Sequence, residues 1–485
     1  MPCTTLTGAA DMTSIPTIPR PVTASGDPVN LAYLLPICLV ATLGGLLFGF
    51  DTGVISGAIE PMTAHFQLSG AMKGWVSACV LIGCTLGVLL VGPLSDRYGR
   101  RLALMLAGLL FFVSSIGTAL PDSVPVFVAF RILAGLGIGF ASMVTPMYIA
   151  EIAPAHLRGR LVATNQIAIV VGLAGVYVAN WCIAGSGDQA WLQSTGWRWM
   201  FASGLIPAVL FLGLLARIPE SPRWLMERQR PDEARRVLTR IFGAQTAESE
   251  LTSIRSAIAA ESGTWRLVFS PALRRPLVIG IALAALQQMT GINVFMYFGA
   301  TIFRSMGEST GVDAGLLQQA VIGGGMIIFT LAAILLVDRW GRRPLMILGS
   351  VGMMLALVAM GLVAQTAANP AATGMLMLAL ILLYTACFSL SVGPVVWVIL
   401  SEIFPTAVRG RALGIAVAFL WMADFLVTQT FPMLDSHPWL VEQFRHAFPF
   451  YLYAGFCLVL ILVMRFVPET KGRSLEEIER GWVRT

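Results

Sequence analysis

The sequence EIAPAHLRGR at residues 151–160 occurs a second time as EIFPTAVRGR at residues 402–411. Two shorter motifs repeat in the same order and at nearly the same offset: DRYGRR (96–101) as DRWGRR (338–343), and PESPR (219–223) as PETKG (468–472). Three markers at an offset of about 250 residues indicate two copies of one structural unit.

The sequence between these motifs is strongly apolar. Of the 485 residues, 56% are hydrophobic and only 12% are charged, and the mean hydropathy is +0.78. A soluble protein has about 25% charged residues, so this composition predicts a membrane protein. Apolar segments of the length that crosses a bilayer, about 20 residues, are predicted at 31–59, 74–95, 102–120, 125–150, 160–184, 197–217, 276–304, 315–337, 344–366, 373–400, 411–433 and 447–467.

Twelve spans in two parallel repeats are an architecture of secondary transporters. The predicted fold class is therefore an all-α membrane protein with two pseudo-symmetric six-helix bundles. The predicted segments are a disordered cytoplasmic tail (1–30), the first bundle (31–217), a cytoplasmic helical linker (218–275), the second bundle (276–467) and a cytoplasmic C-terminal tail (468–485). The linker is either a plain connection or a latch between the bundles; Glu220 and Arg223, beside the repeated motifs, favour the latch.

Positive charge is concentrated in alternate loops. Arginines occur at 97–101, 158–160, 217–275, 339–343 and 409–411, whereas the other loops contain little positive charge. By the positive-inside rule, the arginine-rich loops and both termini are predicted to be cytoplasmic, in a multi-pass protein of the cell membrane. The net charge of +6 is explained by this topology, so we expect no nucleic acid partner.

Several function classes lack their signatures. The seven cysteines and four histidines show no metal-type spacing, so we expect neither a metal site nor a cofactor. The phosphate-binding motif of ATP-driven pumps is absent, which argues against a pump, and no constellation typical of an enzyme is present. A non-transporting sensor on the same fold stays open as an alternative. We expect a monomer in the lipid bilayer.

Both bundles resemble the sugar porter family of the major facilitator superfamily, and most closely its bacterial proton symporters for xylose, galactose or arabinose. The residues that carry the resemblance, besides the repeated motifs, are GGLLFGFDTGVISGA (44–58), FRILAGLGIGFASMVTPMY (130–148), QQMTGIN (287–293) and GPVVWVILS (393–401). The resemblance implies transport of a monosaccharide or polyol by alternating access, in symport with protons. A proton-independent uniporter is the alternative within transport.

Two ionisable residues lie inside predicted spans. Asp51 is in the first span and Arg131 in the fourth, and both are expected in the outer half of the membrane. A charge there costs roughly 2.5–3.5 kcal/mol on insertion scales, which predicts a functional role. We expect Asp51 and Arg131 to form the proton-coupling pair, with a static ion pair as the alternative. By resemblance, an acid at the position of Asp51 is typical of symporters.

Amide and aromatic side chains suit a sugar, because amides match hydroxyl groups and aromatic faces cover C–H surfaces. Gln287, Gln288 and Asn293 bracket Gly291, which predicts an unwound helix there, and Gly393-Pro394 predicts a second break. The predicted substrate residues, several assigned by resemblance, are Phe48, Gln166, Gln287, Gln288, Asn293, Tyr297, Gly393, Trp397, Trp421 and Asp424.

The sequence differs from the family at several positions around the predicted substrate site. Met326 and Leu420 replace family amides, Leu173 replaces the glutamine of pentose symporters, and Phe298 replaces a tyrosine of the outer gate. Asp424 stands where the family usually has asparagine. We expect Asp424 either to be a packed neutral residue or to accept a substrate hydroxyl or a proton. The resemblance therefore predicts the substrate class and leaves the particular sugar open.

The repeated motifs place acids and arginines at helix ends. Such groups can form bidentate pairs between helices and across the bundles, which would have to break when the cytoplasmic side opens. The predicted cytoplasmic gate consists of Asp96, Arg100, Arg101, Glu151, Arg158, Glu220, Arg223, Asp338, Arg342, Arg343, Glu402, Arg409 and Glu469.

Overall fold

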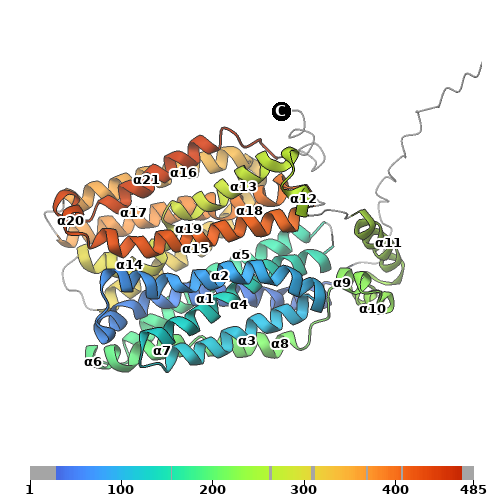
Figure 1. Ribbon diagram of the computed structural model, residues 1–485, viewed down its shortest axis with the longest axis horizontal. Coiled ribbons are helices and arrows are strands. Elements are labelled where there is room, and N and C mark those ends of the chain that lie inside the picture. The colour runs from blue at the N-terminus through green and yellow to red at the C-terminus, as the bar shows by residue number, and fades with distance from the viewer. Residues whose placement is uncertain are drawn as a thin grey trace, which may run out of the picture.

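A computed structural model of the chain describes residues 29–154, 156–260, 265–306, 312–366, 370–405 and 408–471. Eleven helices in these ranges are long and apolar enough to cross a membrane, and a helix pair bent by 80° makes a twelfth span. The predicted fold class is confirmed. Figure 1 shows the helices side by side, with the blue-to-green N-terminal half against the yellow-to-red C-terminal half.

The N-terminal half contains α1 (Leu31–Phe66), α2 (Gly70–Tyr98), α3 (Arg100–Ala119), α4 (Val124–Ile152), α5 (Arg158–Ala184) and a sixth span built from α6 (Gln189–Trp191), the π-helical turn η1 (Leu192–Gly196), α7 (Trp197–Ala202) and α8 (Leu205–Leu215). The linker contains α9 (Pro222–Glu227), α10 (Pro231–Phe242), α11 (Ala244–Ala260) and α12 (Trp265–Val268). The predicted short helices of the linker are thus present.

The C-terminal half contains α13 (Pro271–Met289), α14 (Ile292–Met306), α15 (Val312–Trp340), α16 (Arg342–Thr366), α17 (Pro370–Leu390), α18 (Val392–Ile403), α19 (Arg409–Asp435), α20 (Pro438–Phe444) and α21 (Phe448–Val463). Helices α13 and α14 form one broken span, and so do α17 and α18. The last span is the bent pair α20 and α21.

Helix packing repeats between the halves. Within the first half, α2 packs on α4 and α1 on α5, and their counterparts α15 on α17 and α13 on α19 do the same in the second half. Between the halves, α2 packs on α19 and α5 on α15. The pseudo-two-fold axis relates these two contacts to each other. Corresponding helices of the two halves therefore border both sides of the space between the halves.

The repeated glycine of the DRYGRR and DRWGRR motifs turns the chain between two spans. Gly99 has φ +103° and Gly341 has φ +87°, a conformation that other residues rarely adopt. A Cβ atom on either glycine would collide with or press on a glutamate carboxylate, Glu220 beside Gly99 and Glu469 beside Gly341. The glycine therefore permits both the turn and the close approach of the acid.

Several predicted helix boundaries were wrong by more than three residues, and three of the corrections have a structural reason. The first span continues to Phe66, because His65 and Phe66 pack on the ring of Trp197. The sixth span begins at Gln189 rather than 197, where the side chain of Asp188 caps α6 by accepting a hydrogen bond from the backbone of Trp191. Tertiary contacts thus extend the first span at its C-terminal end, and a side-chain cap extends the sixth span at its N-terminal end.

The third correction is the second helix break, which lies at Ser391 rather than at Gly393-Pro394. Both of these residues are in the first turn of α18. Proline has no backbone N–H and clashes with the preceding turn, so the helix is interrupted just upstream of Pro394.

Candidate functional site

The predicted proton-coupling residues meet in the interior of the N-terminal half. Nη1 of Arg131 donates to both carboxylate oxygens of Asp51, at 2.8 Å each. Arg131 is fully buried, and its guanidinium lies 5.7 Å from the ring centroid of Phe201. Nε and Nη2 of Arg131 are buried without a hydrogen-bond partner among the described residues. Unused buried donors are costly in a fixed ion pair, which favours a pair with a second arrangement.

The two helix breaks of the C-terminal half are tied to each other. Gln287 of α13 donates from Nε2 to the carbonyl oxygens of Val392 and Gly393, at 3.0 and 2.9 Å. Tyr384 of α17 donates to the carbonyl oxygen of Thr290, at 2.9 Å. These bonds tie the first break to the start of α18 and to α17, and the bond from Tyr384 satisfies a carbonyl group at the C-terminal end of α13.

Gly291 explains why α13 ends where it does. Its φ is +91°, and a Cβ atom there would lie 2.6 Å from the ring of Tyr453. The predicted unwinding at Gly291 is present, and it places Asn293 so that its amide nitrogen donates to Oε1 of Gln288, at 2.9 Å. Two predicted substrate residues therefore form one polar group at the break.

Aromatic side chains from the two halves meet between α1 and α19. The rings of Phe48 and Trp421 are edge to face with centroids 5.3 Å apart. Tyr297 is buried, whereas Gln166 and Trp397 are partly exposed. The structure thus joins the predicted residues of both halves at Phe48 and Trp421.

Three of the predicted substrate residues have a buried polar atom without a partner in the described part of the chain: Oε1 of Gln287, Nε1 of Trp421 and Oδ2 of Asp424. Buried polar atoms in native proteins are almost always hydrogen-bonded. Two of these atoms are acceptors and one is a donor, and a hydroxyl group can pair with either kind.

Asp424 is fully buried in α19. Its Oδ1 accepts a hydrogen bond from Thr428 at 3.1 Å, and the amide of Asn293 lies within reach of the carboxylate. No ion pair to Asp424 is present among the residues that the structure describes. The carboxylate is therefore held by neutral donors and lies beside the polar group of the first helix break.

The residues at which this sequence differs from the family are apolar and lie in the interior. Leu173, Met326 and Leu420 are buried. Phe298 is also buried and stacks on Phe431, with ring centroids 5.3 Å apart. Phe298, which replaces the tyrosine of the family, thus forms an aromatic contact between α14 and α19.

The end of the bundle opposite the arginine motifs is closed by contacts between the halves. Oε1 of Glu60 in α1 accepts from Nζ of Lys73 and from Oγ1 of Thr301 in α14, both at 2.5 Å. Tyr177 of α5 donates to the carbonyl oxygen of Met296, at 3.0 Å. The sequence did not predict Glu60 as a functional residue, because the predicted first span ended at residue 59.

Glu60→Gln is expected to open this closed end. The substitution removes a partly buried charged contact, worth about 1 kcal/mol, and shifts the ratio of closed to open molecules about fivefold. Distances between spin labels at the exposed positions Met72 and Trp439 measure the shift. Glu442→Gln, at an exposed acid of the same end, is the matched control, and identical distance distributions for both variants would contradict a closing role.

The start of α5 is exposed at the arginine-rich end of the molecule. Residues 158–160 at the start of α5 are exposed, and no residue from 162 to 169 is buried. A Cβ atom on Gly159 or on Gly410 would meet nothing within 4 Å. Hydrogen bonds therefore join the halves at the Glu60 end, and the start of α5 at the opposite end is exposed.

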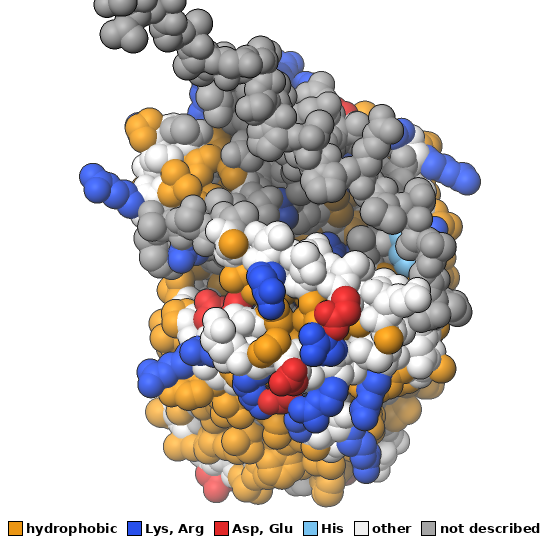
Figure 2. Space-filling view, turned by 90° about the vertical axis from the view of Figure 1, so that its right-hand side faces the viewer, with side chains coloured by type: hydrophobic (Ala, Val, Ile, Leu, Met, Phe, Trp, Pro, Cys, Tyr) orange, Lys and Arg blue, Asp and Glu red, His pale blue; other side chains and the backbone are white. Residues whose placement is uncertain are grey.

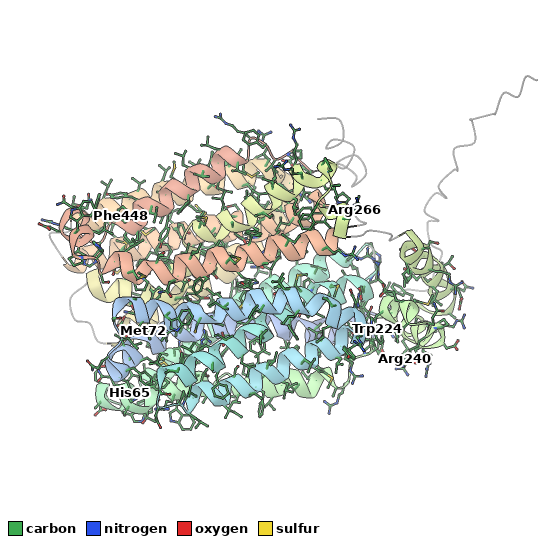
Figure 3. The ribbon with its side chains drawn as sticks, in the orientation of Figure 1. His65, Met72, Trp224, Arg240, Arg266 and Phe448 are labelled. Carbon is green, nitrogen blue, oxygen red and sulfur yellow. The ribbon has the colours of Figure 1, made fainter. Side chains whose placement is uncertain are left out.

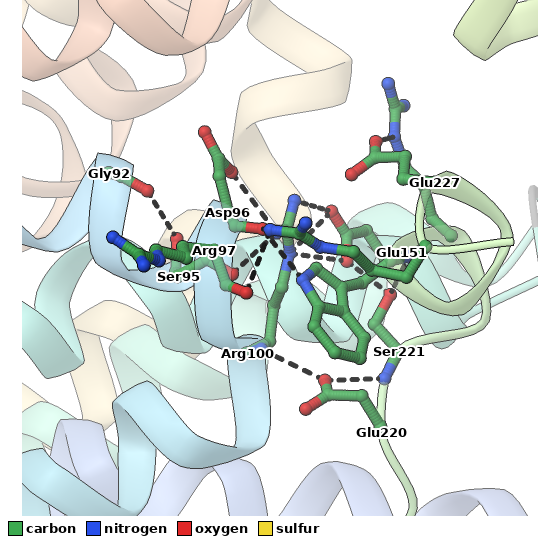
Figure 4. Close-up of polar contacts among 12 residues, drawn as sticks. Gly92, Ser95, Asp96, Arg97, Arg100, Glu151, Glu220, Ser221 and Glu227 are labelled. Atoms are coloured by element: carbon green, nitrogen blue, oxygen red, sulfur yellow. Dashed lines mark hydrogen bonds and ion pairs between the residues drawn. The ribbon is translucent and has the colours of Figure 1, made fainter. Parts of the chain in front are cut away.

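The acids and arginines of the first motif form one network within the N-terminal half (Figure 4). Arg100 contacts the carboxylate of Glu151 at 3.1 Å and that of Asp96 at 3.2 Å. Ser221 also donates to Glu151, and Glu220 accepts from the backbone N–H groups of Arg100, Arg101 and Ser221. The start of the linker is thus bound to α3 and α4.

The second motif repeats this arrangement in the C-terminal half. Arg342 contacts Glu402 at 3.1 Å, and Glu469 accepts from the backbone N–H groups of Arg342 and Arg343. Burial acts to raise the pKa of Glu469, but backbone N–H groups outweigh it and hold the pKa below its usual value. Burial raises the pKa of Glu220, and its backbone donors oppose this only in part.

The pairs of both networks are formed in this structure. Arg100 with Glu151 and Arg342 with Glu402 each pair within one half, and not across the two bundles. Of the other predicted gate residues, Arg101 donates to the carbonyl oxygens of Leu215 and Ala216 and Arg223 contacts Glu227. Arg158 is exposed, Arg409 donates to the carbonyl oxygen of Phe404, and the side chain of Asp338 lies outside the described residues.

Two structural residues of the site were not predicted. Thr428 holds Asp424, and Tyr384 holds the first helix break. Thr428 was detectable, because it follows Asp424 by one helical turn. Tyr384 gave no signal in the sequence, since its partner is a backbone carbonyl about 94 residues away.

Comparisons with known proteins cover nearly the whole chain. A sequence profile described as "Sugar (and other) transporter" matches residues 37–482. The D-xylose-proton symporter of Escherichia coli (strain K12) is 44% identical over 93% of this chain and 96% of its own length. The arabinose-proton symporter of Bacillus subtilis (strain 168) is 41% identical over 96% and 97%.

A solved structure has the same architecture. The Escherichia coli xylose transporter, in a partially occluded inward-open conformation, superposes with a TM-score of 0.81 at 42% identity. The superposition covers 91% of this chain and 100% of that chain.

Proposed function

Because the chain belongs to the family of sugar (and other) transporters, we propose that it carries a monosaccharide or polyol across the membrane in symport with protons. The family resemblance predicted from the sequence is confirmed. Transport proceeds by alternating access, in which the two halves expose the site between them to one side of the membrane at a time. The chain is a transporter on the major facilitator fold.

The observation that carries the proposal is the coincidence of two features on one route. A carboxylate–guanidinium pair, Asp51 and Arg131, lies in the interior of the N-terminal half, and partnerless polar atoms of Gln287, Trp421 and Asp424 are buried in the C-terminal half. The ion pair can take up a proton on Asp51, and the partnerless polar atoms can bind the hydroxyl groups of a ligand.

Proton coupling follows from the electrostatics of the pair. While Asp51 is ionised, its attraction to Arg131 holds α1 against α4. Protonation removes the negative charge and leaves a neutral carboxyl group that binds the guanidinium more weakly. The two helices are then free to move relative to each other, so that proton binding on one side permits the change of access.

Sugar binding uses the polar group at the first helix break and the aromatic contact between the halves. Hydroxyl groups would donate to Oε1 of Gln287 and to Asp424, and accept from Nε1 of Trp421. Gln166, Gln288 and Asn293 supply further amides, and the rings of Phe48 and Trp421 cover C–H surfaces. A substrate with a hydrogen-bonding face and an apolar face fits this wall.

Orientation follows from the arginine distribution. We place the repeated motifs, the linker and both termini in the cytoplasm and the protein in the cell membrane, as a monomer. We assign the six-helix halves to residues 31–217 and 276–467 and the linker to 218–275, with α13 starting slightly earlier, at Pro271. The arginine-rich end, with the start of α5, then faces the cytoplasm.

Uptake by purified protein in proteoliposomes tests the proposal. An inward proton gradient should drive accumulation of at least one labelled hexose, pentose or inositol, and the other members of the panel should compete. If none of them competes or shifts the melting temperature, while a carboxylate or an amine does, the proposed substrate class is wrong.

Met326→Asn combined with Leu420→Gln is expected to tighten the binding of common hexoses. The substitutions restore amides on the buried apolar wall, and each hydrogen bond to a sugar hydroxyl contributes about 0.5–1.5 kcal/mol, or up to about tenfold in Kd. Met326→Leu with Leu420→Met keeps the wall apolar and serves as the control. Equal Kd values for the two double variants, measured by calorimetry, would mean that the sugar does not approach this wall.

A further inference from the structure

A cavity of about 510 Å³ lies at the arginine-rich end, outside the route between the halves. It is enclosed by the ends of α1, α2 and α3 on one side and by α9 and α10 of the linker on the other. Trp224 and Arg240, labelled in Figure 3, are on its linker side. Figure 2 shows the arginine and acidic side chains gathered on this end of the molecule.

The cavity is basic. Arg101, Arg230, Arg236 and Arg240 line it, together with Glu220 and Glu233. Both acids are already engaged: Glu220 accepts three backbone N–H groups, and Glu233 pairs with Arg230 at 2.5 Å. Two positive charges are therefore in excess around the cavity.

Arg236 and Arg240 account for this excess. They are one turn apart on α10, so their side chains are neighbours. Neither forms an ion pair with a residue that the structure describes: Arg236 donates to the carbonyl oxygen of Asp232, and Arg240 lies 6.0 Å from the ring centroid of Tyr33. Guanidinium groups without acidic partners beside a cavity are suited to a phosphate group.

The cavity also has an apolar wall that continues onto the lipid-facing surface. Tyr98, Leu102 and Met105 line it, and Tyr98 and Leu102 are 50% and 40% exposed at the ends of membrane spans. A ligand with an anionic head and an apolar chain would satisfy both walls. A free phosphate would satisfy only the first.

We propose that this cavity binds the phosphate group of an anionic phospholipid such as phosphatidylglycerol or cardiolipin, between α10 and the end of α3. Basic pockets beside membrane spans at the cytoplasmic surface are suited to such headgroups. The bound lipid connects the linker to the N-terminal half, since Arg236 and Arg240 are in α10 and Arg101 is in the repeated motif. The proposal requires membrane insertion but does not depend on which solute is transported.

Native mass spectrometry of the full-length protein, titrated with phosphatidylglycerol or cardiolipin, tests the proposal. Arg236→Gln with Arg240→Gln should weaken lipid binding about 25-fold, since each arginine contributes about fivefold. The matched control is Arg255→Gln with Arg266→Gln, which removes the same charge from exposed linker positions outside the cavity. Arg236→Lys with Arg240→Lys should retain most of the binding and excludes a folding defect.

The outcomes separate the sources of the phosphate. Stronger binding of phosphatidylglycerol than of phosphatidylcholine or glycerol phosphate supports a lipid, and equal binding of glycerol phosphate at the same arginines supports a soluble phosphate ligand. Unchanged lipid binding by the Arg236→Gln, Arg240→Gln variant, or an equal loss in the control variant, would overturn the site. Because binding is read directly, failure of sugar transport would leave this result unaffected.

Discussion

Asp51→Asn is expected to abolish proton-driven accumulation of the substrate and to leave exchange of substrate across the membrane intact. Asparagine stays hydrogen-bonded to Arg131 in both conformations but cannot take up a proton. With one proton per sugar, a gradient of one pH unit is worth about 1.4 kcal/mol and supports about tenfold accumulation. The variant should reach a ratio of one.

Proteoliposomes loaded with buffer at one pH and diluted into another measure the accumulation, and liposomes preloaded with unlabelled sugar measure the exchange. Glu60→Gln is a useful comparison, because it also changes an acid of α1 but should keep the coupling. Accumulation by the Asp51→Asn variant at the native level would show that the proton binds elsewhere. Loss of both activities would indicate a static structural pair.

Asp424→Asn is expected to change the affinity for substrate, and the preference among sugars, without removing coupling. A carboxylate that accepts a hydroxyl group forms a charge-assisted bond worth about 1.5–3 kcal/mol, so its loss weakens binding about 10- to 100-fold. Asparagine also brings the residue typical of the family to this position, so sugars that need an amide donor should gain in competition assays.

Thr428→Val is the control for this prediction. It removes the neighbouring hydroxyl group that donates to Oδ1 of Asp424 while leaving the partnerless Oδ2 in place, and it should have a smaller effect on the preference. If Asp424→Asn abolishes accumulation and Asp51→Asn does not, the proton has been assigned to the wrong helix. If neither preference nor affinity changes, Asp424 is a packing residue.

The spans and the charged pair could be predicted because each depends on a strong local signal. A bilayer requires about 20 apolar residues per helix, and Asp51 and Arg131 stand out against such segments. Helix ends were less predictable: the polar stretch at 189–196 is helical because of the Asp188 cap. Neither Phe66 packing on Trp197 nor Tyr384 bonding to the carbonyl of Thr290 has a counterpart in sequence periodicity.

The gate shows a different limit. The repeated acids and arginines form contacts between helix ends, such as Arg100 with Glu151. Because the same acids and arginines occur in both halves, the motif itself does not say which half supplies each partner. The pairs lie within each half, so their part in closing the cytoplasmic side stays a prediction.

The reciprocal bonds of Gln287 and Tyr384 have a mechanical consequence. Each broken span could in principle bend at its own joint, α14 relative to α13 and α17 relative to α18. Gln287, beside the first joint, is bound to the backbone just after the second, and Tyr384 of α17 is bound to the backbone at the first, so the two spans are linked. Bending of either broken span in the C-terminal half would therefore strain a hydrogen bond to the other span, so we expect the two spans to move together.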